Sequence, residues 1–351
     1  MPDQLQLEGH KLLYHLDAVE KWMRGEFFYP LHLDIGATSM CNIRCVHCFY
    51  DYLGHKQYVL QRERLLGLMD EIGPLGVKSI YFASNGEPLM NPAVPDAIAR
   101  AKNNGVDAAL ATNGILLTRE ISEKILPHLS WIRLSILASS EKLYCVLHRA
   151  KPQDYKRLMK NISDAVAVKR KNHLAVTIGI QMSLLPQNGA EIATLAAMAK
   201  AMGADYITIR PICLTERNQF RVGRNLTERF SRQIRRAQAR ADKHFYVSVR
   251  QGLEREIKEY TQCLGLPFLS YVAADGGVYA CGCFLEEPGY FLGSIYKKSF
   301  KDIWRSRRRQ EVMEKIARKQ DFSKCDTLCR HHSINKFLFQ LKNPPEHVNF
   351  I

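Results

Sequence analysis

The sequence predicts an α/β protein with a parallel sheet. Short apolar or β-branched runs alternate with segments of helical periodicity over much of the chain. Each helix is then expected to cross over between two parallel strands. The 351 residues are enough for a core domain and a smaller second module.

Six strands are predicted, each bounded by turn residues. They are Leu31–Gly36, Ser79–Phe82, Asp107–Ala111, Trp131–Ile136, Ala175–Met182 and Tyr206–Ile209. Helical spacing of apolar residues predicts the helices Leu60–Ile72, Val94–Asn103, Glu120–Leu126, Tyr155–Arg170 and Ala190–Ala201. Active sites of parallel barrels form at the carboxyl ends of the strands. Residues that follow each strand are therefore the first functional candidates.

Three cysteines follow the first strand, with the spacing C-x3-C-x2-C: Cys41, Cys45 and Cys48. Four-iron clusters normally take a thiolate at every iron. Three thiolates therefore leave one iron open for a ligand that is not protein. The other interpretations are a zinc site with His47 as a fourth ligand, or a disulfide framework. Motifs after the next strands disfavour both.

The segment from Cys41 to Cys48 resembles the signature of the radical S-adenosylmethionine (SAM) superfamily. The resemblance implies a partial (β/α)6 TIM-like barrel and a 4Fe-4S cluster whose open iron binds SAM. Asn85-Gly86-Glu87-Pro88, after the second strand, is similar to the family's glycine-glutamate motif, and Thr112-Asn113-Gly114 is a family marker after the third. On this resemblance, the residues that contact SAM are Gly86, Glu87, Asn113, Ser135 and Arg149.

A second cysteine group lies near the carboxyl end. Cys263 is followed by twelve residues, Gly276, four residues and Cys281. This spacing resembles the SPASM and Twitch extensions of radical SAM enzymes, which implies a small α+β module with an auxiliary 4Fe-4S cluster. The implied ligands are Cys263, Cys281, Cys325 and Cys329, with Cys283 as a spare or substitute. Four thiolates also satisfy a structural zinc site, which stays the alternative. Asp275-Gly276-Gly277 predicts a hairpin turn.

These assignments divide the chain into five parts. An N-terminal helical segment is expected to pack an apolar stripe (Leu12, Leu13, Leu16, Val19, Trp22) on the barrel. The apolar end of the tail, Val348 to Ile351, is expected to dock on the body. The parts are an N-terminal segment 1–30, a radical SAM core 31–224, a helical linker 225–260, an auxiliary-cluster module 261–335 and a tail 336–351.

Composition and charge indicate where in the cell the protein works and which kinds of partner it binds. The chain has no signal peptide and no apolar run long enough to span a bilayer, and its cysteines occur at cluster-ligand spacing, so we expect a cytoplasmic protein. The formal net charge is +15. Basic runs at Arg232–Arg236 and Arg305–Arg309 are read as solvated faces, with attraction of an anionic partner as the alternative. Neither run carries the aromatic residues of a nucleic-acid platform, so no nucleic acid is expected.

The resemblance implies reductive cleavage of SAM and abstraction of a hydrogen atom from a substrate by the 5′-deoxyadenosyl radical. A fully ligated second cluster favours oxidation (dehydrogenation), with epimerisation and radical elimination as the other outcomes. Only forty residues precede Cys41, which favours a small sugar or nucleotide-sugar substrate over a peptide. The electron donor is expected to be flavodoxin or ferredoxin. Alternatives are a peptide-modifying maturase and a non-catalytic iron-sulfur scaffold or regulatory protein.

Two residues at the end of the sixth strand are further candidates. Cys213 is expected near the barrel mouth, where its thiol could give a hydrogen atom to a substrate radical and so invert a stereocentre. The alternative is that Cys213 is a small buried hydrophobe, as free cysteines usually are. Arg210 is expected to bind a substrate phosphate or carboxylate, because its planar donor fork suits such groups.

Overall fold

The computed structural model describes residues 11–54, 56–212, 225–250, 258–319, 321–322, 325 and 329–350. Within them the strands form one sheet in the order β10-β9-β8-β1-β2-β3-β4-β5-β6-β7. The strands are β1 (His32–Ile35), β2 (Ser79–Phe82), β3 (Asp107–Thr112), β4 (Leu129–Ser135), β5 (Thr177–Ser183), β6 (Tyr206–Arg210), β7 (Tyr246–Val249), β8 (Leu269–Val272), β9 (Gly277–Tyr279) and β10 (Phe291–Ser294). The six strands expected from the sequence are β1 to β6.

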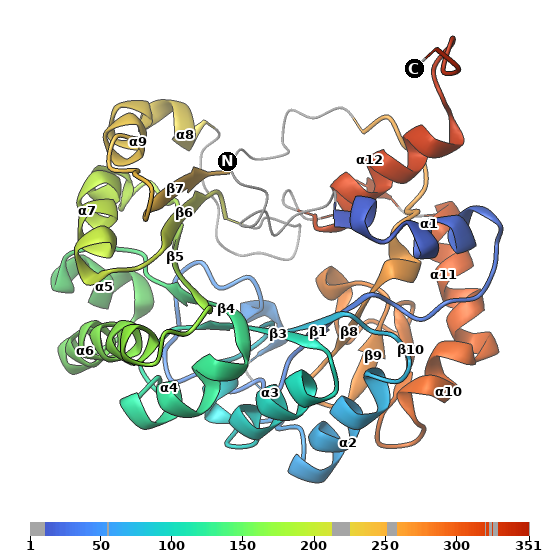
Figure 1. The fold of residues 1–351 in the computed structure, drawn as a ribbon, viewed down its shortest axis with the longest axis horizontal. Coiled ribbons are helices and arrows are strands. Elements are labelled where there is room, and N and C mark those ends of the chain that lie inside the picture. The colour runs from blue at the N-terminus through green and yellow to red at the C-terminus, as the bar shows by residue number, and fades with distance from the viewer. Residues whose placement is uncertain are drawn as a thin grey trace.

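Most helices cover the outer side of this sheet, whereas α1 (Leu16–Met23) and α12 (His331–Lys342) lie together at the open side of the arc (Figure 1). The other described helices are α2 (Arg62–Ile72), α3 (Val94–Asn103), α4 (Arg119–Ile125), α5 (Glu141–His148), α6 (Pro152–Lys171), α7 (Ile192–Met202), α8 (Leu226–Arg229), α9 (Ser231–Gln238), α10 (Phe300–Arg305) and α11 (Arg307–Lys319). Among the described residues, no helix is both long and apolar enough to cross a membrane.

The parallel strands β1 to β7 form an open arc, a partial TIM-like barrel (Figure 1). Side chains alternate across each strand. On the outer face, Leu33, Ile132 and similar aliphatic residues are fully buried against the helices. On the inner face, polar and aromatic residues such as Tyr81 and Arg133 take the intervening positions. The outer face of the sheet therefore carries the apolar core, and the inner face carries polar and aromatic side chains.

One strand and one strand pairing were not expected. β7 lies in the stretch 225–260, which was predicted to be helical, and pairs in parallel with β6. β8 pairs in parallel with β1, with Asp34 opposite Tyr271. The predicted hairpin turn is confirmed between the antiparallel strands β8 and β9, where Gly276 has φ +79°. The carboxyl-terminal module is thus part of the same sheet as the barrel.

The two ends of the chain pack differently from expectation. In the amino-terminal stripe, Leu12 and Val19 are buried, but their cluster includes Phe268 and Leu338 of the carboxyl-terminal part of the chain, where packing on the barrel was expected. Leu13 and Leu16, however, are 49% and 63% exposed, because only part of the stripe faces the body. The expected docking of the tail is wrong. Val348 and Phe350 are 55% and 84% exposed, beyond a proline pair that cannot continue α12.

The basic run at Arg305–Arg309 packs partly against aromatic rings. Arg305 lies over Phe27, at 5.0 Å from the ring centre, and Arg309 lies over Trp304 at 4.4 Å. Burial lowers the pKa of Arg309 to about 10. The arginines of α9, by contrast, are exposed, as a solvated face requires.

Candidate active site

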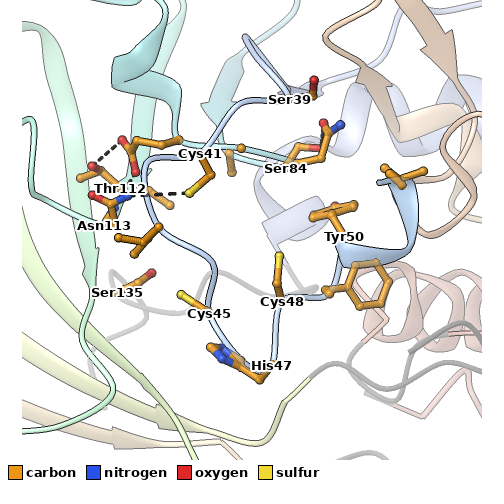
Figure 2. A pocket seen from close by; sticks show the side chains of 18 of the residues that line it. Ser39, Cys41, Cys45, His47, Cys48, Tyr50, Ser84, Thr112, Asn113 and Ser135 are labelled. Carbon is orange, nitrogen blue, oxygen red and sulfur yellow. Dashed lines mark hydrogen bonds between the residues drawn. The ribbon is translucent and has the colours of Figure 1, made fainter. Parts of the chain in front are cut away.

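The first three cysteines lie on the loop after β1 and line one cavity of about 250 Å³ (Figure 2). Backbone bonds fix the loop. Val46 N donates to Leu147 O at 2.9 Å, and Arg44 N donates to His148 O at 3.3 Å. These bonds attach the loop to the end of α5 and bring the thiols to the carboxyl edge of the strands.

Burial makes these thiols hard to ionise without a metal. It raises the pKa of Cys41 to about 11 and the pKa of Cys45 well above its ordinary value. The pKa of Cys48 is also raised by burial. Iron binds the thiolate, so loading this loop must release protons and is easier at higher pH. In the described part of the chain, no three His, Cys, Asp or Glu side chains converge on a single ion. A cluster does not require that convergence, because each thiolate binds its own iron.

His148, at the end of α5, contacts one of the thiols directly. Its Nε2 accepts a hydrogen bond from Leu137 N at 3.1 Å, and its Nδ1 lies 3.2 Å from Cys45 Sγ. Burial, and after it the neighbouring His47, lowers the pKa of His148 to about 3, so the ring is neutral. A neutral ring whose Nε2 accepts must carry its proton on Nδ1. The Nδ1–H group therefore donates to Cys45 Sγ.

The opposite wall of the cavity is the turn after β2. Gly86 has φ +139°, and a Cβ there would lie 2.2 Å from Thr38 O, so only glycine fits. Glu87 is 2% exposed and accepts hydrogen bonds from Thr112 Oγ1 at 2.6 Å and Asn113 N at 2.7 Å. Burial raises the pKa of Glu87 to about 7, although these hydrogen bonds act in the other direction. This carboxyl group can therefore change its charge near neutral pH.

The remaining candidates for SAM contacts separate into two groups. Asn113 Nδ2 lies 3.9 Å from Cys41 Sγ, and both Asn113 and Ser135 line the cavity with the cysteines (Figure 2). Arg149 is exposed, follows α5 with φ +48°, and is not among the residues that line the cavity. The structure thus brings together four of the five predicted contacts: Gly86, Glu87, Asn113 and Ser135.

The cavity has the features that a cluster and SAM require. Three thiols line it, together with Gly86 and Glu87. His47 Nδ1 is buried in its wall and has no hydrogen-bond partner among the described residues. A buried polar atom without a partner is costly, and a bound ligand would supply one. The residues present therefore fit both groups.

A second cavity of about 240 Å³ adjoins the first. Phe49, Tyr50, Ala83 and Ser84 line both cavities and form the shared wall. The second cavity is also lined by Cys281, Cys283 and Cys329. It therefore lies between the first cysteine loop and the carboxyl-terminal cysteines.

Most charged side chains that line the second cavity were not identified as candidates from the sequence. Arg133 on β4 is 7% exposed, donates to Tyr81 Oη at 3.0 Å and lies over Trp131 at 5.1 Å. Arg330 contacts both carboxylate oxygens of Asp34. A charged residue between Ile132 and Leu134 in the predicted strand was the available signal for Arg133.

The carboxyl-terminal cysteines gather beside α12. Asn335 Nδ2 lies 3.6 Å from Cys263 Sγ, and burial raises the pKa of Cys263 to about 12. The thiol of Cys281 interacts with those of Cys283, Cys329 and Cys263. Cys325 is among the groups that act on Cys263. The spare cysteine, Cys283, thus acts on Cys281 and Cys263 together with the predicted ligands.

Of the two candidates at the end of β6, the structure describes Arg210 but not Cys213. Arg210 lines the second cavity, and its Nη1 lies 3.5 Å from Gln181 Oε1. Cys213 lies outside the described residues. The hypothesis that Cys213 donates a hydrogen atom therefore stays a prediction.

Comparison with known families agrees with this geometry. Residues 35–199 match the radical SAM superfamily. Residues 263–331 match SPASM, an iron-sulfur cluster-binding domain. The chain is therefore a radical SAM enzyme with a carboxyl-terminal SPASM domain. Its cofactors are SAM and 4Fe-4S clusters, which these two domains imply.

Curated relatives are similar to the chain at low identity. A tungsten-containing aldehyde ferredoxin oxidoreductase cofactor-modifying protein of Pyrococcus furiosus is 24% identical over 51% of this chain, and the match spans half of that protein. An AdoMet-dependent heme synthase of Methanosarcina barkeri is 25% identical over 85% of this chain and 87% of its own length. These relatives differ in what they are named for, so they do not name a substrate.

Solved structures share the fold. SuiB of Streptococcus suis, bound to S-adenosylmethionine, superposes with a TM-score of 0.65 at 15% identity, over 86% of this chain and 73% of SuiB. SuiB bound to its precursor peptide SuiA superposes with a TM-score of 0.64 at 16% identity, over 84% of this chain and 68% of SuiB. At this identity the likeness concerns the fold alone.

Proposed function

We propose that this enzyme removes a hydrogen atom from a small, carbohydrate-like substrate and so oxidises or epimerises it. The observation that carries the proposal is the position of the second cavity. It shares a wall with the first cavity and is also lined by Cys281, Cys283 and Cys329. A substrate there would lie beside SAM and beside the auxiliary cluster at once.

In this proposal Cys41, Cys45 and Cys48 hold the first cluster, and Gly86, Glu87, Asn113 and Ser135 hold SAM. Arg149 would join them only by movement of an exposed side chain. SAM bound to the open iron of a cluster supplies, on one-electron reduction, a 5′-deoxyadenosyl radical. The carboxylate of Glu87 suits the SAM ammonium group, and Tyr50 and Phe49 shield the shared wall from water.

Oxidation needs a second electron acceptor close to the substrate. Cys263, Cys281, Cys325 and Cys329 are the proposed ligands of an auxiliary 4Fe-4S cluster, with Cys283 as a substitute. Three of these five cysteines line the second cavity, which supports dehydrogenation over epimerisation. An external one-electron donor such as flavodoxin or ferredoxin would reduce the first cluster.

A peptide substrate is the second candidate. The fold is like that of SuiB, which has been solved with a precursor peptide. The volume of the second cavity, about 240 Å³, instead suits a small molecule. The genes beside this one separate the two candidates, since a maturase needs a precursor peptide and a sugar-modifying enzyme does not.

The proposal is tested by reconstituting the protein with iron and sulfide without oxygen, adding reductant and SAM, and measuring 5′-deoxyadenosine. Wild type should form it, and Cys45→Ala should not. Cys145→Ala is the matched control, because Cys145 lies on α5 away from both cavities. A wild-type protein that contains both clusters yet forms no 5′-deoxyadenosine would favour the non-catalytic scaffold.

A further inference from the structure

We propose that the second cavity binds a carboxylate or phosphate group of the substrate, and that Arg133 is its main ligand. This rests on the proposed function only in taking the cavity as the substrate site. It adds the chemical class of the substrate, which must be anionic. The evidence comes from the charge of the cavity, from the state of Arg133 and from its position in the barrel.

Positive charge dominates the walls of this cavity. The described residues that line it include four arginines and a single acidic residue, Asp34. Arg330 contacts both oxygens of Asp34, so these two charges offset each other. Arg133, Arg210 and Arg250 also line the cavity, from β4, the end of β6 and the position just after β7. Three positive side chains around one small cavity attract an anion.

Arg133 is held ready for such an anion. Tyr81 Oη accepts a hydrogen bond from Nη2 at 3.0 Å, and the rings of Trp131 and Tyr81 lie 5.1 and 5.9 Å from its guanidinium carbon. Its Nε, in contrast, is buried and has no hydrogen-bond partner among the described residues. Leaving a buried charged donor unpaired is expensive. The planar donor fork of arginine matches a carboxylate or phosphate with two parallel hydrogen bonds.

The position of Arg133 fits a substrate anchor. It lies two residues before Ser135 on the same face of β4, and Ser135 lines the first cavity. Two residues of a strand span about 7 Å. In register, Arg133 has Ala111 beside it on β3, and this small residue lets the guanidinium reach across to Tyr81 on β2. An anion on Arg133 would therefore keep the rest of a small substrate next to SAM.

The test measures anion binding by the reconstituted holoprotein without oxygen, using calorimetry. Inorganic phosphate and succinate are the probes, so that a phosphate and a carboxylate source are distinguished. We expect wild type to bind at least one of them. Arg133→Met should weaken that binding tenfold or more. Arg232→Met, which removes an exposed arginine of α9, should leave the affinity unchanged.

Iron content shows whether each variant has kept its clusters. If Arg133→Met loses iron, Arg133→Lys replaces it, since lysine keeps the charge and the long stem but not the donor fork. Equal affinity in wild type and the Arg133 variant overturns the assignment, as does a wild type that binds neither probe. Formation of 5′-deoxyadenosine is measured on the same wild-type sample. If it forms while no probe binds, the proposed function stands and the anionic substrate is wrong.

Discussion

At the scale of single residues, buried polar side chains determine how the site would work. His148, Glu87 and Arg133 are each below a tenth exposed, and each has a defined hydrogen-bond partner. The cysteines, Gly86 and Glu87 were predictable because their spacing is a short-range pattern. His148 and Arg133 were not, because their roles depend on neighbours far away in the sequence, Cys45 and Tyr81.

Replacing His148 should make the first cluster harder to reduce. The Nδ1–H group donates to Cys45 Sγ, and such a bond stabilises the more negative, reduced cluster most. His148→Phe keeps a ring against Tyr144, whose centre is 4.2 Å away, but loses the donor. We expect the midpoint potential of the first cluster to fall by some tens of millivolts, on the order set by a fraction of one charged hydrogen bond. Redox titration followed by EPR measures it.

The auxiliary cluster serves as an internal reference in this titration, because His148 lines the first cavity and is not among the described residues that line the second. Its potential should not move. An unchanged potential of the first cluster would mean that the Nδ1–H group is only a packing contact.

SAM binding should depend on pH through Glu87. Burial raises the pKa of Glu87 to about 7, so the group is neutral below that pH and a carboxylate above it. SAM carries an ammonium group that prefers the carboxylate, so affinity should rise about tenfold per unit up to pH 7 and then level off. Calorimetry between pH 5.5 and 7.5 measures it on the reconstituted protein. Glu87→Gln should bind more weakly with a flat profile, and an equally steep profile in that variant would contradict this role.

At the scale of elements, the alternation of strand and helix was predicted closely because it depends on the local spacing of apolar residues. β2 and α3 have their predicted limits, and the other core strands differ by a few residues at their ends. β8 could not be assigned to the barrel, because its partner β1 lies more than two hundred residues earlier. β7 was missed because two short helices with basic residues precede it.

The pair of Asp34 and Arg330 ties β1 to the start of α12. Burial alone would raise the pKa of Asp34, but the guanidinium of Arg330 and the ring of His32 lower it to about 2. The stability from this pair is fully present above pH 4, where Asp34 is ionised even in the unfolded chain. It is lost as the pH falls through about 2.

Arg330→Met should therefore lower the free energy of unfolding by on the order of 3 kcal/mol, because it leaves Asp34 buried without its partner. Anaerobic thermal unfolding at pH 7 measures the effect as a lower melting temperature. In the double variant Asp34→Asn, Arg330→Met no charge is left unpaired, so part of the loss should be restored. A double variant less stable than Arg330→Met would contradict a specific coupling.

At the scale of the whole molecule, the sheet joins the two cysteine groups. Because β8 pairs with β1, the hairpin β8–β9 brings Cys281 and Cys283 to the barrel interior. The sequence predicted both groups but not the cavity between them. That cavity depends on inward side chains from β1, β2, β4 and β6, which no short pattern can relate.

The auxiliary cluster should be separable from the first one. Cys263→Ala, Cys281→Ala is expected to lose about four irons per chain and to keep the other cluster. Iron and sulfide analysis of the reconstituted protein measures this, with Cys145→Ala as the matched control. If the double variant retains the full iron content of wild type, these two cysteines are not ligands.

The central claim is that one cluster has an open iron for SAM and the other does not. EPR spectra of the reduced protein with and without SAM test it most directly. SAM should change the signal that is lost in Cys45→Ala and leave unchanged the signal that is lost in Cys263→Ala, Cys281→Ala. A spectrum in which SAM changes neither signal, or changes only the signal that depends on Cys263 and Cys281, would contradict the account.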